Sequence, residues 1–307
     1  MIKLLLRKFL QGLMMILIVS AVTFALLGFA GGDALTQLRD NSQISAVTIE
    51  RLRSVYGLDQ PLPKRYFRWL SGAVKGDLGE STYFHVPVSG LVLSRSVSTF
   101  WLGTAAFAIA LILAVPLSLI GVRYQSTAIA ALIDSVILLS ASTPRIVLAL
   151  VALAISVRLT ASAMDSSSAV LFWLAALALS APLISVFLAQ FHGELRRTMR
   201  EDFIKLARAK GLSESSVILR HALRPALNPV LTIAGLSLGS VLGGSVVVES
   251  VLGRQGIGTL MVSAVRARDL PLVMGIVLFT STAVWLGNAI GELLQAANDK
   301  RIRDLGF

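Results

Sequence analysis

Six apolar runs, each long enough to cross a lipid bilayer, divide the chain of 307 residues and limit what it can fold into. A membrane-spanning helix needs about 20 consecutive, mainly apolar residues. Hydrophobic residues make up 55% of the sequence and charged residues 15%, which is too apolar a balance for one soluble core. The sequence therefore predicts an all-α polytopic membrane protein with six transmembrane helices, at about 9–30, 100–122, 133–157, 169–191, 230–248 and 272–294.

The formal charge of +11 is carried by basic residues in short segments that flank the apolar runs. This is the distribution that the positive-inside rule expects of a membrane protein, so we expect contact with membrane lipid and no nucleic-acid partner. The chain contains no cysteine, which excludes disulfides and thiolate metal sites.

Both ends of the chain and the polar segment between the fourth and fifth runs are basic, and the same rule places them in the cytoplasm. The first run is longer than a usual signal-peptide core, so we expect an uncleaved span rather than a leader removed near residue 30. The predicted parts are the cytoplasmic N-terminus with the first helix (1–31), an extracytoplasmic insertion (32–96), a five-helix core (97–295) with a cytoplasmic loop inside it (192–228), and a cytoplasmic tail (296–307).

A polar, basic island at 201–229 is predicted to contain two short helices. Phe203 and Leu206 stand at helical spacing in the first of them. Gly211 tolerates the positive φ of a residue that follows a helix end, and Ser213 is a good N-cap for the second helix.

The second island helix is expected to end near Arg224, because Pro225 disfavours helix at the residue before it. Asn228 and Pro229 are then expected as the N-cap and first residue of the fifth span. A helix–glycine–helix unit at the membrane face would fit a groove on a partner protein. An ordinary cytoplasmic loop is the alternative interpretation.

The insertion is predicted to hold a helix at 46–56 that ends at Gly57, and an interfacial helix after Pro63 that carries Tyr66 and Trp69. A second outer loop is expected at 249–270.

Pro144 predicts a kink in the third span, and Arg145 stands beside it. A charge inside a span is costly and usually faces a cavity or a partner. A lumen-facing position, snorkelling and a contact with another subunit all remain open for Arg145.

Gly235, Gly239 and Gly243 in the fifth span repeat every four residues, which predicts close packing against another helix. The same stretch contains G-L-S-L-G, formally the nucleophile elbow of a hydrolase. That motif needs a strand-to-helix turn and a nearby histidine. Here it lies within an apolar span, and the histidines are expected in polar loops, so the sequence argues against an intramembrane enzyme.

The island carries A-R-A-K-G-L-S, then R-H-A-L-R, then N-P, and it resembles the EAA loop of ABC importer permeases of the dipeptide/oligopeptide branch. The segment Lys205-Leu206-Ala207 takes the place of Glu-Ala-Ala, and Gly211 matches the family's glycine. Further matches are G-L-D-Q-P-L at 57–62, G-D-L-G-E-S at 76–81, A-R-D-L-P at 267–271 and K-R-I-R at 300–303. Departures are G-G-D-A at 31–34, where Pro-Gly-Asp-Pro is usual, and Gln255, where proline is common.

The resemblance implies the B-type permease subunit of an ABC importer in the inner membrane, with the type I permease fold. It implies as partners a second homologous permease, two ATPase subunits and an extracytoplasmic substrate-binding protein. The residues that it assigns to ATPase coupling are Glu201, Asp202, Lys205, Ala207, Arg208, Ala209, Lys210, Gly211, Leu212, Ser213, Arg220 and His221.

The sequence contains no G-x-x-x-x-G-K-[ST] phosphate loop, so ATP and Mg²⁺ are expected on the ATPase subunits. We expect this chain to bind no cofactor or metal and to have no catalytic residues. A self-sufficient ion channel is a rival class, but it gives no reason for the polar island.

The resemblance implies short peptides as substrates, and the spans agree with it. A transporter that handled bare metal ions would be expected to place imidazoles or carboxylates inside its spans. The predicted spans hold no histidine, and Asp134, Glu249 and Glu292 lie near span ends. Nickel chelates, glutathione and peptide-like antibiotics remain open as substrates.

Overall fold

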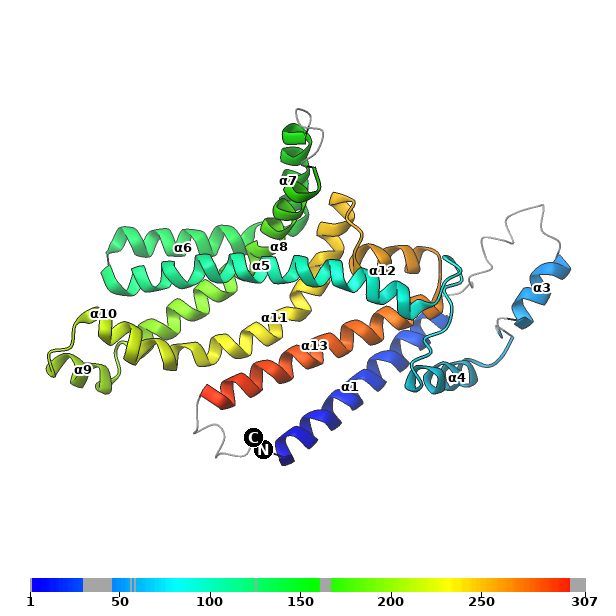
Figure 1. Ribbon diagram of the computed structural model, residues 1–307, viewed down its shortest axis with the longest axis horizontal. Helices are drawn as coiled ribbons and strands as arrows, with labels where there is room; N and C mark the ends of the chain where they lie inside the picture. Colours follow the sequence, from blue (N-terminus) through cyan, green and yellow to red (C-terminus); the bar gives the residue numbers. More distant parts are fainter. Residues whose placement is uncertain are drawn as a thin grey trace. The chain divides into compact units, whose positions relative to one another are not determined.

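The computed structural model describes residues 2–29, 46–55, 57, 59–124, 126–160 and 167–298, and the regular elements in these ranges are all helices (Figure 1). Two compact units are formed by these residues. As far as they are described, one contains residues 2–5, 99–254 and 284–298, and the other contains Leu6–Ser98 and Gln255–Ala283. The helices are α1 (Ile2–Phe29), α3 (Ala46–Val55), α4 (Leu62–Val74), α5 (Val88–Tyr124), α6 (Thr127–Ser142), α7 (Arg145–Thr160), α8 (Ser167–Thr198), α9 (Asp202–Ala209), α10 (Glu214–Ser216), the π-helical η1 (Val217–Ala222), α11 (Leu223–Leu252), α12 (Ile257–Arg266) and α13 (Leu270–Asn298).

Five helical stretches in the described residues are long and apolar enough to cross a membrane: α1, α5, α8, α10 to α11, and α13. The pair α6 and α7 would make a sixth span if it is counted as one broken helix. All six predicted runs are therefore helical.

The first unit is built around α8, which packs against α6, α7 and α11. The largest buried side chains of α8 include Phe187 and Phe191, and the ring of Phe187 lies 5.7 Å from that of Phe107 on α5. Small residues let helix backbones approach one another in a membrane protein. On α5 the buried residues Ala106, Ala110 and Ala114 repeat every four positions and form such a seam.

Pro144 ends a helix instead of bending one. The α6 and α7 axes differ by 93°, and Figure 1 shows α7 turning away from α6. Thr143 has ψ of 117°, the extended conformation that a residue before proline favours. The prediction of a kink at Pro144 was right in position. The span predicted at 133–157 is formed by two helices bent at this proline, either one broken span or a re-entrant loop.

Arg145, the first residue of α7, points to α11 in the same unit. Its guanidinium donates a hydrogen bond of 2.5 Å to Ser240 Oγ. A Cβ on Gly244 would lie 3.0 Å from Arg145 Cζ, so the guanidinium rests against the α11 backbone. Within the described residues, Arg145 therefore makes a contact between α7 and α11.

The island's second helix does not end before Pro225. Residues Glu214–Leu252 form one helical stretch of 39 residues, with the π-helical η1 near its start. The Leu223 N–H donates to the Ile218 carbonyl, five residues back. This π-helical turn ends three residues before Pro225, which has no N–H to donate to a regular α-helical ladder. The predicted end near Arg224 and the predicted N-cap at Asn228 were wrong.

Hydrogen bonds and a close backbone contact with α13 hold this stretch of α11. Asn298 Nδ2 donates to the Arg224 carbonyl at 3.0 Å and also to Asn228 Oδ1. A Cβ on Gly235 would lie 2.7 Å from the Gly287 carbonyl oxygen, so the two backbones touch there.

The three glycines predicted to pack differ in their surroundings. At Gly239 a Cβ would make an ordinary contact of 3.8 Å with Val284, and at Gly243 the described residues leave open space within 4 Å. The backbone-to-backbone approach is therefore at Gly235.

Helix α11 continues to Leu252 and is ended by Gly253 at φ +65°. Glu249, predicted to begin an outer loop, is instead a buried residue of this helix. It is 1% exposed and accepts a 2.6 Å hydrogen bond from Thr99 Oγ1. His192, predicted to lie in a loop, is a buried residue of α8. Consequently only residues 199–213 of the predicted 192–228 loop lie outside the long helices, and α9 is among them.

In the second unit, α4 docks on α1 through Tyr66. The Tyr66 hydroxyl lies 2.9 Å from Ser20 Oγ, and its ring meets that of Phe24 edge-on at 5.4 Å. Gly57 has φ of +63°, which confirms the predicted helix end at that position. Tyr56 and Leu58 lie outside the described residues.

Candidate functional site

The residues assigned to coupling lie mainly in the segment 201–216, which we call the coupling segment and which comprises α9, a glycine turn and α10. One side of α9 is buried through Ile204 and Ala207. The neighbouring side exposes large apolar side chains: Phe203 is 44% exposed and Leu206 is 56% exposed. Exposed apolar side chains on a short, anchored helix are suited to insertion into a groove.

The turn after α9 is a Schellman motif. Gly211 has φ of +78°, as expected, and its N–H donates to the Arg208 carbonyl at 2.9 Å. The Leu212 N–H donates to the Ala207 carbonyl at 3.4 Å. The C-cap of α9 is Lys210, and this pair of bonds forms when the next residue, here Gly211, is left-handed.

A bidentate ion pair crosses this turn and joins α9 to α10. Arg208 Nη2 lies 2.6 Å from Glu214 Oε1, and Nε lies 3.1 Å from Oε2. The hydrogen bonds to Glu214 raise the pKa of Arg208. The pair favours one angle between the two helices, since one edge of the guanidinium binds both carboxylate oxygens.

A second ion pair lies wholly on the surface of α9. Lys205 Nζ lies 2.8 Å from Asp202 Oδ1. The hydrogen bond from Lys205, together with its charge, lowers the pKa of Asp202, and the same pair raises the pKa of Lys205.

The remaining assigned residues are placed less uniformly. Ser213 is the N-cap of α10 by position, but among the described residues its side chain accepts no hydrogen bond from the first turn. Arg220 and His221 lie beyond the coupling segment on η1, where His221 Nδ1 is 3.4 Å from the Ser216 carbonyl. Ala209 ends α9, and Glu201 precedes it as N-cap.

In the second unit, the loop 76–88 carries the other strong sequence match and is tied down by Asp269. This carboxylate is fully buried and accepts from Ser81 Oγ at 2.5 Å and from the Tyr83 N–H at 3.0 Å. Its other oxygen accepts from the Leu272 N–H at 3.1 Å and so caps α13.

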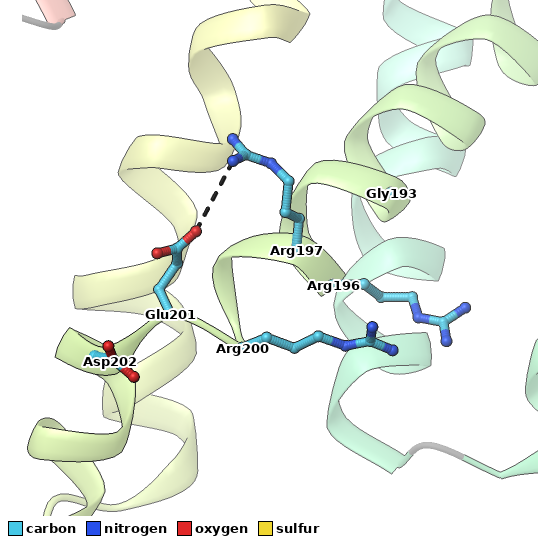
Figure 2. Close-up of a pocket in the computed structure, with 6 residues that line it drawn as sticks. All are labelled: Gly193, Arg196, Arg197, Arg200, Glu201 and Asp202. Atoms are coloured by element: carbon cyan, nitrogen blue, oxygen red, sulfur yellow. Dashed lines mark ion pairs between the residues drawn. The ribbon is translucent and has the colours of Figure 1, made fainter.

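Sequence reasoning missed a basic cluster beside the coupling segment. Arg196, Arg197 and Arg200 lie at the end of α8 and line a pocket with Gly193, Glu201 and Asp202 (Figure 2). The signal was present, because three arginines fall within five residues at the end of a span. From the sequence, these arginines were used only to place this end of the span in the cytoplasm.

Residues 106–304 match the family described as "Binding-protein-dependent transport system inner membrane component", and residues 1–111 match its N-terminal companion. The chain is 34% identical to a putative peptide permease protein of Brucella suis biovar 1, over 97% of this chain and 98% of the relative. It is 34% identical to a putative peptide transport system permease protein of Brucella abortus, over 98% of each. It is 32% identical to a glutathione transport system permease protein of Pectobacterium atrosepticum, over 94% of each.

These matches confirm the family resemblance drawn from the motifs, and they agree with the helices described above. The chain belongs to the binding-protein-dependent transport system inner membrane components, the permeases of ABC importers, and has their all-α type I fold.

Proposed function

We propose that this chain forms half of the translocation path of an ATP-driven importer for short peptides. One observation carries the proposal: relatives that share about a third of their residues over nearly the whole chain are named for peptides, and another is named for glutathione, itself a tripeptide. The chain would pair with a second homologous permease, and two ATPase subunits and an extracytoplasmic binding protein would complete the importer.

The coupling segment would dock on an ATPase subunit. Its exposed Phe203 and Leu206 supply the apolar contact, and the Schellman turn with the Arg208–Glu214 pair keeps the two short helices at a fixed angle. A rigid docking element loses little conformational entropy when it binds.

Movement of the coupling segment would reach the membrane through α10, η1 and α11. Because Glu214–Leu252 is one helical stretch, a displacement at its start is passed along the helix without an intervening loop. ATP binding would close the ATPase pair and draw the two coupling segments together. Rigid-body movement of the spans then turns the path outward, and hydrolysis resets it.

The orientation that this mechanism requires has both termini and the coupling segment in the cytoplasm. The chain contains no cysteine, so a single introduced cysteine can be labelled without background. An impermeant reagent added to intact cells should label a cysteine at the exposed positions Glu80 or Tyr83 and should not label one at Ser213. The reverse pattern would overturn the orientation.

Substrate class is tested by deleting the gene and measuring uptake of labelled dipeptides, tripeptides, pentapeptides and glutathione beside nickel. Loss of uptake of at least one peptide, restored by the gene, is the expected result. Unchanged peptide uptake with a fall in nickel uptake would refute the peptide assignment while leaving the permease role intact.

The coupling role is tested by Gly211→Val. A β-branched residue at φ +78° costs about 1–2 kcal/mol of strain and misdirects the second helix. We expect normal membrane insertion, weakened ATPase association and loss of transport. Gly90→Val is the control, because Gly90 has no positive φ and its Cβ would meet nothing within 4 Å. Normal transport by Gly211→Val would remove the segment from the mechanism.

A further inference from the structure

The basic pocket at the end of α8 adjoins the coupling segment but is not lined by Phe203 or Leu206, the exposed apolar residues of the proposed ATPase contact. It has a volume of about 570 Å³ and is lined by Gly193, Arg196, Arg197, Arg200, Glu201 and Asp202. Figure 2 shows the Arg196 and Arg200 side chains extending to the same side, away from the carboxylates of Glu201 and Asp202.

The acids that line the pocket are already paired. Glu201 is 3.9 Å from Arg197, which also binds Glu194 at 2.9 Å, and Asp202 binds Lys205 at 2.8 Å. Arg196 and Arg200 have no ion pair with any residue that the structure describes. Two uncompensated guanidinium groups thus face one opening, which calls for an anion.

An exposed stripe on α8 leads from an apolar surface to these arginines. Val186, Ala189, Gly193 and Arg196 are exposed, and their spacing of three or four residues places them on one side of α8. Arg200, also exposed, follows in the turn after the helix. Val186 and Ala189 lie within the candidate membrane span Ser168–Thr198, and the arginines stand at and just beyond its end. The stripe therefore pairs an apolar surface at membrane depth with positive charge at the headgroup level.

A ligand that matches both parts is amphiphilic and carries a phosphate. Guanidinium groups bind phosphate oxygens in bidentate fashion, and basic pockets beside membrane helices bind anionic lipid headgroups. A soluble phosphate would satisfy the arginines and leave Val186 and Ala189 uncovered.

We propose that Arg196 and Arg200 bind the phosphate of an anionic phospholipid whose acyl chains lie along Val186 and Ala189. The side chain of Gly193 is a single hydrogen, and a Cβ there would meet nothing within 4 Å, so the headgroup has space between the apolar and basic parts of the stripe. This lipid site does not depend on what the importer carries.

The proposal is tested with the full chain, purified and stripped of lipid, by native mass spectrometry with added phosphatidylglycerol or phosphatidylcholine. The wild type should retain phosphatidylglycerol in preference to phosphatidylcholine. The double variant Arg196→Gln/Arg200→Gln should bind phosphatidylglycerol about 30-fold more weakly, the effect expected of two basic residues at a membrane surface. Equal retention of the two lipids, or unchanged binding by the double variant, would refute the site.

Two controls are needed, one for the general loss of positive charge and one for whether the bound phosphate belongs to a lipid or to a soluble anion. The variant Arg123→Gln/Arg220→Gln removes the same charge elsewhere in the unit and should keep the lipid preference; an equal loss there would show a non-specific charge effect and refute the site. Glycerol phosphate and inorganic phosphate are the soluble competitors. Failure of both to displace phosphatidylglycerol supports a lipid site, and displacement by either at low concentration would mean a soluble-anion site.

A folding defect is recognised by gel filtration of the double variant. Arg196→Lys/Arg200→Lys keeps the charge and loses the bidentate fork. It should show an intermediate affinity, and an affinity equal to that of the wild type would refute phosphate recognition by the guanidinium groups.

Discussion

The coupling segment 201–216 and the loop 76–88 are both polar and contain glycine, yet different kinds of interaction stabilise them. The loop is anchored by the carboxylate of Asp269, which is 0% exposed, as is its partner Ser81. The coupling segment is closed by the backbone hydrogen bonds of its Schellman turn, and its ion pairs lie at the surface, where the side chains of Asp202 and Lys205 are 94% and 67% exposed. The loop binds a buried carboxylate of its own unit, whereas the coupling segment leaves its apolar residues Phe203 and Leu206 exposed.

The difference shows what a polar segment in a membrane protein can be used for. Buried hydrogen bonds to a charge fix one conformation, since breaking them leaves unsatisfied groups. Surface ion pairs contribute little stability. A segment whose charged side chains lie at the surface is therefore shaped mainly by its backbone, and its surface remains available to a partner protein. Mutations should therefore have effects that fall steeply from the loop to the coupling segment.

Asp269→Ala is expected to have the largest effect. It leaves the Ser81 hydroxyl and the N–H groups of Tyr83 and Leu272 without their acceptor. We expect a loss on the order of 3 kcal/mol or more, because each buried group left unsatisfied costs about 1–3 kcal/mol. The measurement is the thermal unfolding midpoint of the purified chain in detergent.

Asp77→Ala is the matched control, since Asp77 also accepts a backbone N–H, from Gly79 at 2.9 Å, but is exposed. Its midpoint should stay close to that of the wild type. Equal midpoints for Asp269→Ala and Asp77→Ala would show that burial does not separate the two carboxylates.

Ser81→Ala should follow with a smaller loss. Its hydroxyl donates to Asp269 and accepts the Phe84 N–H at 2.9 Å. Asp269 keeps its two backbone donors, so we expect a cost of about 1–2 kcal/mol. Limited proteolysis within 76–88 should increase in membranes that contain this variant, and an unchanged cleavage rate would argue against Ser81 as an anchor of the loop.

Sequence reasoning predicted what depends on local chemistry and missed what depends on distant partners. Gly211 was predicted as a left-handed position and Gly57 as a helix end, and both have positive φ, the conformation that glycine adopts at no steric cost. Asp269 is different. Its partner Ser81 lies 188 residues away, so the sequence does not show that this carboxylate is the anchor of the loop.

The prolines make the same point. Pro144 and Pro225 both predicted an interruption, but the chain turns by 93° at the first and runs on as helix through the second. At Pro225 the preceding π turn and the hydrogen bond from Asn298, 74 residues beyond Arg224, accompany the continuous helix. A proline in the sequence shows where a helix can be interrupted, and tertiary packing determines whether the helix ends there.

The Arg208–Glu214 pair should have a smaller effect than either buried residue. Its side chains are 40% and 27% exposed, so solvent screening limits the contribution to about 1 kcal/mol or less. A double-mutant cycle with Arg208→Gln and Glu214→Gln measures the coupling free energy from thermal midpoints. The exchange Arg208→Glu/Glu214→Arg should restore part of it, and no coupling at all would mean that the Schellman turn alone sets the helix angle.

Asp202→Asn should have the smallest effect, with a thermal midpoint indistinguishable from the wild type at neutral pH. The lowered pKa of Asp202 means that its contribution is present above the ordinary aspartate pKa and is lost as the pH falls through the lower folded-state value. The raised pKa of Lys205 acts at the other end of the scale, where the contribution is lost as the pH rises through the higher folded-state value. Between these limits the small contribution of the pair should not change with pH, and added salt should weaken it further. The check is to record midpoints of both proteins across that range. A clear difference at neutral pH, comparable to that of Ser81→Ala, would mean that the coupling segment is held by its charges after all, and the contrast between the two segments would fail.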